Sequence, residues 1–141
     1  MPKENRREAR IQAVQQLYGA EMRGVLVLGS EEKSGTLVGD VMAPFATDLL
    51  AITIERLTEI DELLGNALQN WSLQRLGAVD RAVLRLAVAE MLARPDIPAA
   101  VTINEAIEMA RSLASTESAR FANGVLDRVR REIGRASHGV S

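Results

Sequence analysis

The sequence predicts an all-α fold, an antiparallel bundle of amphipathic helices, and three observations carry this prediction. Only 4 of the 141 residues are proline and 3% are aromatic, and the chain is rich in strong helix formers. Apolar residues recur at three- and four-residue steps along most of the chain. The links between these stretches are short, as in antiparallel bundles. We expect one domain over residues 1–136, with a flexible tail over 137–141.

The first half of the chain predicts two helices separated by a polar segment. Residues 5–22 form the first, with an apolar stripe made by Ala9, Ala13, Val14, Leu17 and Tyr18. Glycine and serine punctuate residues 23–40, which we expect to be a loop or a short frayed element. From Phe45 to Leu68 the apolar positions stay on one helix face, so one long amphipathic helix is predicted there.

A new helix start near Ser72 and, after it, a buried helix are predicted next. Ser72 can act as an N-cap, and Trp71 is placed to pack against Leu76 as a hydrophobic staple. Gly77 marks a short turn. Between residues 79 and 92 apolar side chains surround most of the helix circumference, which is typical of a central buried helix.

The last third predicts two more helices. Pro95 and Pro98 end the central helix and force an extended link. Thr102 and Glu105 have the spacing of a capping box at the start of the following helix.

Ser115 or Thr116 can cap the final helix, and Gly134 is the expected stop. Gly124 lies inside this helical pattern, and we expect it to permit close packing of a neighbouring helix. Asn104 is interpreted as an internal hydrogen-bonding group.

Composition disfavours catalysis, metal binding and a membrane location. The chain has no cysteine, which excludes disulfides and thiolate metal sites and fits a reducing, cytoplasmic compartment. The only histidine, His138, lies in the predicted tail, and no nucleophile–base pair or glycine-rich phosphate loop can be assembled. No apolar run approaches the roughly 20 residues that a membrane span needs. We therefore expect neither enzymatic activity nor a cofactor.

Charge is unevenly distributed although the formal net charge is only −2. Residues 1–10 hold four basic side chains against two acidic ones, and residues 120–135 hold five against two. Residues 31–69 hold eight acids against two bases. Both ends of the chain are therefore candidates for contact with an anionic partner.

The basic residues near the N-terminus are Arg6, Arg7 and Arg10. They lie in the first turns of a helix, where the positive end of the helix dipole disfavours cations. One interpretation is a phosphate-binding patch, because arginine offers a planar fork of donors. The alternative is a solvated face partly neutralised by Glu4 and Glu8.

Arg120 and Phe121 open the last predicted helix in a similar way. An aromatic ring beside an arginine can stack an unpaired base while the cation holds the backbone. Phe121 also begins the apolar stripe of that helix, so core packing is the alternative. If both basic helix starts contribute, we expect them to come together as one shallow anion-binding surface.

Several stretches of the sequence together resemble the NusB family. These are residues 6–18, residues 79–90, an INEAIE element at 103–108 preceded by Ile97 and Pro98, and an FANGVLD element at 121–127 that follows Arg120. The resemblance covers about half of the chain. It implies an all-helical NusB fold of two packed helical subbundles, without catalytic activity.

The resemblance also implies partners. Family members bind the boxA element of ribosomal RNA leader transcripts together with NusE, a small-subunit ribosomal protein, and join a complex that keeps RNA polymerase from terminating. Some members are homodimers and others are monomers, and the sequence leaves that choice open. A helical protein-binding scaffold or accessory module with little RNA affinity is the alternative, favoured by departures from the family pattern at Glu8, Ala89, Ala99, Ala100 and Ala119.

Site residues follow from matching positions in the family. The resemblance assigns RNA contacts to Arg6, Arg7, Arg10, Arg85, Arg120 and Phe121. It assigns protein-partner contacts to Tyr18, Asp80, Arg81 and Glu117. A surface charge network among the residues of the central helix and a favourable dipole contact at Glu117 are the alternatives. Arg128, Arg130 and Arg131, near a helix C-terminus, are interpreted as structural.

Overall fold

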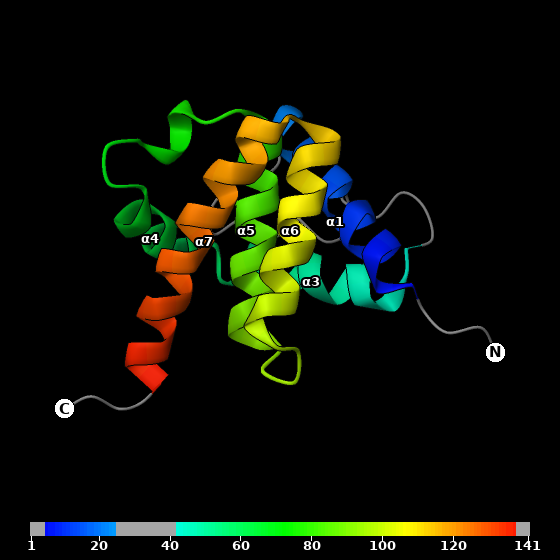
Figure 1. Cartoon of the computed structure of the whole chain (residues 1–141). Helices are drawn as coiled ribbons and strands as arrows, with labels where there is room; N and C mark the ends of the chain where they lie inside the picture. The colour runs from blue at the N-terminus through cyan, green and yellow to red at the C-terminus, as the bar shows by residue number, and fades with distance from the viewer. Residues whose placement is uncertain (1–4, 25–41, 138–141) are drawn as a thin grey trace.

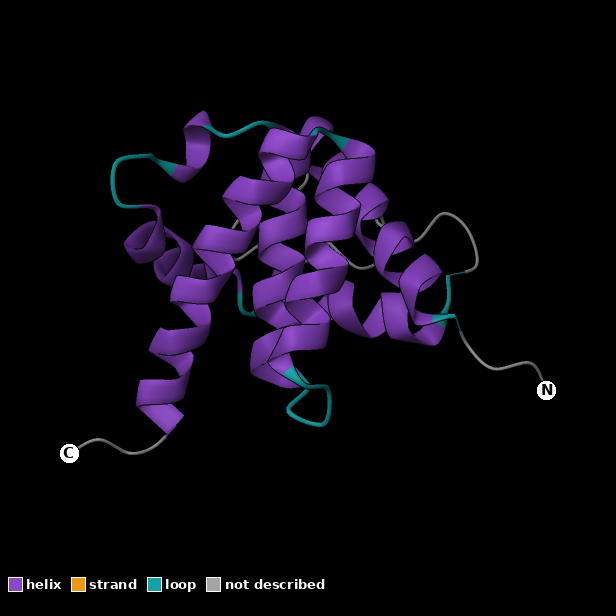
Figure 2. Ribbon diagram, in the orientation of Figure 1, coloured by secondary structure: helices purple, strands orange, loops and turns teal. Residues whose placement is uncertain are grey.

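The computed structural model describes residues 5–24 and 42–137, and within these ranges every regular element is helical (Figure 2). The expected loop at 23–40 lies almost wholly outside the described residues, as does His138. The elements in chain order are α1 (Arg6–Met22), α3 (Pro44–Glu55), α4 (Leu57–Leu68), the 3-10 turn η1 (Leu73–Arg75), α5 (Ala78–Ala93), α6 (Ala99–Leu113) and α7 (Thr116–Ser137). The predicted all-α fold is confirmed. None of the described helices is long and apolar enough to cross a membrane.

Helix α5 lies at the centre of the bundle (Figure 1). On one side α1 and α3 pack against α5 and against each other. On the other side α6 and α7 pack together and against α5, and α4 packs against α7 and α5. The two helix groups therefore share α5, and α6 lies between α1 and α7 (Figure 1).

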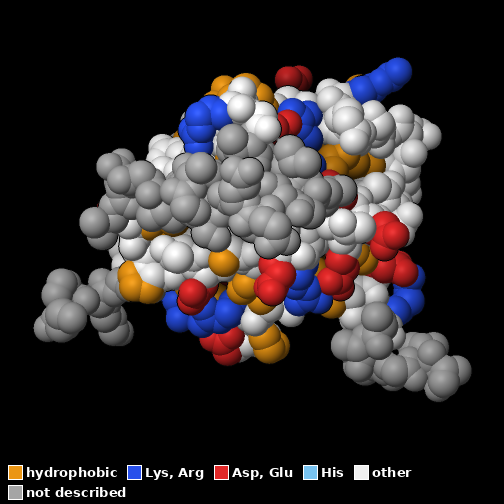
Figure 3. All heavy atoms as spheres, turned by 180° about the vertical axis from the view of Figure 1, so that it is seen from behind, with side chains coloured by type: hydrophobic (Ala, Val, Ile, Leu, Met, Phe, Trp, Pro, Cys, Tyr) orange, Lys and Arg blue, Asp and Glu red, His pale blue; other side chains and the backbone are white. Residues whose placement is uncertain are grey.

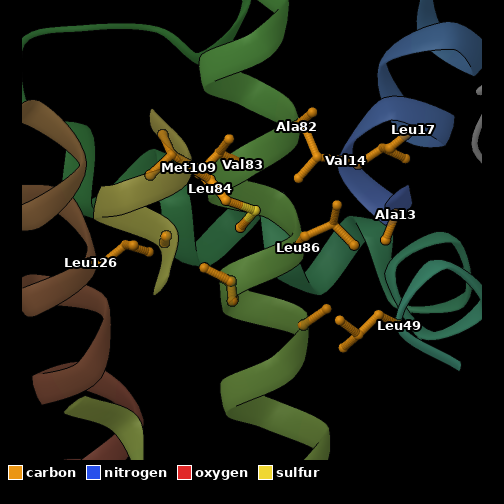
Figure 4. Packing of buried hydrophobic residues seen from close by; sticks show 14 of the residues in the cluster. Ala13, Val14, Leu17, Leu49, Ala82, Val83, Leu84, Leu86, Met109 and Leu126 are labelled. Atoms are coloured by element: carbon orange, nitrogen blue, oxygen red, sulfur yellow. The ribbon is translucent and has the colours of Figure 1, made fainter. Parts of the chain in front are cut away.

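The core is built from small and branched aliphatic side chains along α5 and its neighbours (Figure 4). Residues 82–90 of α5 are all buried, which confirms the predicted central helix. Leu17 of α1, Leu49 of α3 and Leu126 of α7 project toward it and are almost completely inaccessible to solvent. Burying such a leucine stabilises the fold by about 1.5–3 kcal/mol.

Side-chain caps define the beginnings of the first and last helices. Asn5 caps α1, because its Oδ1 accepts a hydrogen bond from the backbone N–H of Glu8 at 3.1 Å. Ser115 caps α7, because its Oγ accepts from the N–H of Ser118 at 3.0 Å. Of the two residues proposed as this cap, the structure selects Ser115.

The long helix predicted from Phe45 to Leu68 is instead two helices, α3 and α4, that meet at Arg56. The apolar periodicity continues across the break, so the pattern alone predicted one helix. The packing partners change at this point, because α3 lies against α1 whereas α4 lies against α7. A straight helix could not pack against both, and the chain turns at Arg56.

Two predicted helix boundaries were also wrong. Helix α6 begins at Ala99, directly after Pro98, so Thr102 and Glu105 lie inside it and form no capping box. Helix α7 continues through Gly134 to Ser137, one residue beyond the expected domain boundary.

Three local interpretations also change. Trp71 is 56% exposed, and Ser72 precedes η1 without a capping hydrogen bond from its side chain. A Cβ placed on Gly124 would find its nearest neighbour, Arg128 Nη2, at 3.9 Å, so no helix approaches this glycine closely. Asn104 is exposed on α6 rather than internal.

Candidate nucleic-acid interface

Arg10 does not lie on the surface. Its Nε and Nη2 donate to the two carboxylate oxygens of Glu90 at 2.8 and 2.7 Å, and both side chains are buried. Thr102 Oγ1 donates to the same carboxylate at 2.6 Å. This network joins α1, α5 and α6, so the prediction that Arg10 contacts RNA phosphate is replaced by a structural role.

Arg6 lies beside Arg10 on the same helix and is exposed. Its guanidinium carbon is 5.1 Å from the centroid of the Phe45 ring. The guanidinium carbons of Arg10 and Arg94 each lie 5.2 Å from that centroid. Three cations thus share one aromatic ring, an arrangement that each cation–π contact stabilises by about 0.5–2 kcal/mol. Arg94, which was not predicted as a site residue from the sequence, therefore lies with Arg6 and Arg10 around the Phe45 ring.

Arg7 is exposed and forms a two-pronged ion pair with Glu105 on α6. Nε and Nη2 of Arg7 donate to the Glu105 carboxylate at 3.0 and 2.8 Å. The hydrogen bonds and positive charge of Arg7 lower the pKa of Glu105, and the hydrogen bonds and negative charge of Glu105 raise the pKa of Arg7. Because 61% of the Arg7 side chain is exposed, its guanidinium remains accessible to an anion that competes with the carboxylate.

The two arginines of α5 are engaged inside the protein. Arg85 donates to both carboxylate oxygens of Asp61 at 2.9 Å and is itself buried. Arg81 donates from Nε to Glu21 at 2.8 Å and from Nη1 to the carbonyl oxygens of residues 73, 74 and 76. Arg81 thereby holds η1 against α5. The geometry supports structural roles for Arg85 and Arg81 instead of the predicted RNA and partner contacts.

The remaining residues assigned to a protein partner are accessible. Tyr18 is 39% exposed on α1, and Glu117 is exposed in the first turn of α7. Asp80 is half-buried in the first turn of α5. Carboxylates at these two helix beginnings also interact favourably with the helix dipole, so they can serve stability and recognition together.

Arg120 and Phe121 lie near the start of α7, where Arg120 is exposed and Phe121 is half-buried. Phe121 lines an open hollow of about 180 Å³ together with Trp71 and Arg128. The predicted aromatic site therefore has a second ring beside it. The sequence contained this signal, because Trp71 is the only tryptophan and lies in a link between helices.

The two basic helix starts do not adjoin. Arg7 reaches α6 from the α1 side, whereas Phe121 lies on the side of α7 that faces the turn after α4. Helix α6 lies between α1 and α7 (Figure 1). The expected single shallow surface is therefore replaced by two separate patches.

Charge is mixed on the face seen in Figure 3. Seen from behind, acidic and basic side chains lie interspersed on the described part of the face (Figure 3). In the described ranges no group of three or more His, Cys, Asp and Glu residues is arranged to hold a metal ion. The candidate site consists of exposed arginines and aromatic rings on a scaffold of packed helices, which is the arrangement of a helical binding protein.

Comparison with known proteins identifies the family. Residues 7–131 match the model of the NusB family, and the chain belongs to this family. A transcription antitermination protein NusB from an Exiguobacterium strain is 41% identical over 90% of this chain and 98% of its own length. The NusB of Bacillus velezensis is 39% identical over 91% of this chain and 97% of its own. A relative from Solibacter usitatus is 50% identical, but the match spans only 61% of its length.

Solved structures agree with the sequence comparison. NusB of T. maritima superimposes with a TM-score of 0.76 at 36% identity and covers 93% of this chain and 94% of its own. A chain from the crystal structure of the antitermination factors NusB and NusE in complex with double-stranded RNA gives a TM-score of 0.73 at 25% identity, with 90% and 96% coverage. The expected NusB fold of packed helical subbundles is confirmed.

Proposed function

We propose that this protein is a transcription antitermination factor that binds boxA-type elements of ribosomal RNA leader transcripts together with NusE. One observation carries the proposal: nearly the whole chain superimposes on a chain of the complex of antitermination factors NusB and NusE with RNA. The protein would act by binding alone, as part of the RNA polymerase antitermination complex in the cytoplasm.

The accessible cations and the aromatic ring are the groups suited to RNA. Arg6, Arg7 and Arg120 expose guanidinium groups that can pair with phosphate oxygens. Phe121 offers a ring at the edge of an open hollow, where an unpaired base can stack for about 1–3 kcal/mol. Because the two patches are separated by α6, an extended single strand rather than a compact anion fits them both.

Tyr18, Asp80 and Glu117 are the residues suited to a protein partner. An exposed tyrosine supplies an apolar ring and a hydroxyl group, a combination that is enriched at interfaces. We expect Tyr18→Ala to weaken NusE binding at least tenfold in calorimetry performed well below the thermal midpoint of the variant, because Tyr18 is 39% exposed and its truncation also removes packing within the protein. Sedimentation at several concentrations would test whether a homodimer competes for the same surface.

Salt-dependent RNA binding tests the proposal. Fluorescence anisotropy should show tighter binding of a boxA-type RNA than of a scrambled RNA, and NusE should increase the difference. Equal affinity for the two RNAs, with and without NusE, would contradict the proposal and favour the helical protein-binding scaffold.

Single variants test the assigned cations. Arg6→Ala and Arg120→Ala should each weaken binding and reduce the dependence of log K on log salt by about 0.7, the value for one phosphate of a single strand. Arg56→Ala is the matched control, because Arg56 lies between α3 and α4, away from both patches, and pairs with Glu59. An unchanged salt slope in Arg6→Ala would remove that residue from the site.

A further inference from the structure

We propose that the groove between α4 and α7 is an additional contact site for single-stranded RNA, which runs from Trp71 and Phe121 to Arg131 and Arg135. The inference rests on the proposed RNA-binding function and extends it to nucleotides that flank the primary site. None of these four residues except Phe121 was assigned to RNA from the sequence.

Two hollows that share Arg128 form the groove. The first, of about 180 Å³, is lined by the two aromatic residues and by the end of α4. The second, of about 220 Å³, lies between Leu63 and Asn66 of α4 and Arg131 and Arg135 of α7. Both hollows are open to solvent. Positions 121, 128 and 135 follow one another at two-turn intervals, so the groove extends about 21 Å along α7 at 1.5 Å per residue.

The end of the groove at Trp71 and Phe121 offers aromatic surfaces on which bases can stack. Trp71 is 56% exposed although it is a large apolar side chain, and Phe121 is half-buried beside it. Aromatic rings at the mouth of an open hollow bind successive bases without a sequence requirement, because every base has a flat face.

The end of the groove at Arg131 and Arg135 offers cations whose present ion pairs can be replaced by pairs with phosphate. Arg131 donates to Asp127 at 2.5 Å and Arg135 donates to Glu132 at 2.9 Å. In both pairs the two side chains are 43–67% exposed. Exposed pairs of this kind contribute little to stability, so phosphate oxygens can replace the carboxylates. Arg128 differs, because it donates to the carbonyl oxygen of Ala67 at 2.9 Å and so holds the end of α4 in place.

The combination favours RNA over the other ligands of the same charge. Three arginines line the second hollow, against the carboxylate of Glu132 in the lining and that of Asp127 paired with Arg131, so an excess of one positive charge remains. A free phosphate would not contact the aromatic end of the groove, and an acidic peptide would not need flat surfaces for stacking. A single strand uses both, with its bases at Trp71 and its phosphates at the arginines.

The test compares three RNAs and two double variants. The short RNA carries only the boxA-type element, and each of the two extended RNAs adds unpaired nucleotides at a different end. The wild-type protein should bind one of the extended RNAs several-fold more tightly. Arg131→Ala with Arg135→Ala should bind the short RNA as the wild type does but lose this gain, with a salt slope for the extended RNA reduced by about 1.4, corresponding to two phosphates.

The matched control is Arg56→Ala with Arg111→Ala, which removes two exposed arginines that pair at three-residue spacing elsewhere. It should retain the gain. Binding of the short RNA without any gain on extension would overturn the groove but leave the proposed function intact. Failure to bind any of the three RNAs would overturn both.

Trp71 provides a second readout because it is the only tryptophan of the chain. The extended RNA should quench its fluorescence, and Arg131→Ala with Arg135→Ala should reduce the quenching at equal RNA concentration. Quenching by NusE in the absence of RNA, with none on addition of RNA, would show that the groove binds protein and would overturn the inference.

Discussion

Arg10 on α1 and Glu90 on α5 form a buried two-pronged ion pair, with donor–acceptor distances of 2.8 and 2.7 Å. The Glu90 carboxylate accepts a third hydrogen bond from Thr102. Burying charges is costly unless they are paired and hydrogen-bonded, and this network satisfies both conditions. Arg10, one of the basic residues near the N-terminus, therefore helps to hold α1, α5 and α6 together inside the protein.

Glu90→Gln should destabilise the protein strongly, because it leaves the guanidinium of Arg10 buried without its counter-charge. We expect the free energy of unfolding to fall by about 3–5 kcal/mol, measured by urea denaturation. Glu59→Gln is the control, because its pair with Arg56 is exposed and should contribute less than about 1 kcal/mol. A loss below 1 kcal/mol in Glu90→Gln would show that the network does not stabilise the fold.

Arg85→Ala should also act on stability, since it leaves the partly buried carboxylate of Asp61 without its two hydrogen bonds. We expect a loss of about 3 kcal/mol or more at pH 7. Arg6→Ala, at an exposed position over the Phe45 ring, should lose about 0.5–1 kcal/mol and change RNA binding instead. If Arg85→Ala keeps full stability and loses RNA affinity, Arg85 contacts RNA and its structural role is wrong.

The Arg7–Glu105 pair should make stability depend on pH in the acid range. The pKa of Glu105 is lowered in the folded protein, so its contribution is complete above the unfolded value near 4.5 and is lost as the pH falls through the folded value. The difference in unfolding free energy between the wild type and Glu105→Gln should therefore shrink between pH 7 and pH 3. Since Arg7 is largely exposed, we expect this difference at pH 7 to be much smaller than the loss caused by Glu90→Gln. A difference that grows toward acid would contradict the assignment.

Gly124→Ala should stabilise α7 by about 0.5–1 kcal/mol. A Cβ at this position would meet only Arg128 Nη2, at an ordinary contact distance of 3.9 Å, and alanine favours the helix. Gly24→Ala should have the opposite effect, because Gly24 has a φ of +74° after the end of α1. Thermal unfolding of both variants checks the pair, and a destabilised Gly124→Ala would show that close packing does occur there.

Helical periodicity predicted most of the fold from the sequence. The stripes of α1, α5, α6 and α7 depend only on local spacing, so they could be identified without knowledge of their neighbours. The break at Arg56 could not be predicted, because it reflects a change of packing partner rather than a change of pattern. Ser115 was identifiable as a cap because the capping hydrogen bond is local.

The candidate site was less predictable, because burial of an arginine depends on distant partners. Arg7 and Arg10 look alike in the sequence, yet Arg10 meets a carboxylate 80 residues away inside the core and Arg7 meets Glu105 at the surface. Likewise, Trp71 becomes a neighbour of Phe121 only when the turn after α4 is placed against α7. The resemblance to the family could indicate which residues occupy the site positions, but it could not show whether their side chains are exposed.

The central position of α5 has a consequence for how the molecule comes apart. Residues 82–90 of this helix are buried by groups that include both the first and the last helices of the chain. Separating either group would expose the mostly apolar surface of α5 to water and would break the buried ion pairs of Arg85 and Glu90. The molecule is therefore expected to melt in a single cooperative step, and a fragment ending before Ala78 is expected to stay unstructured.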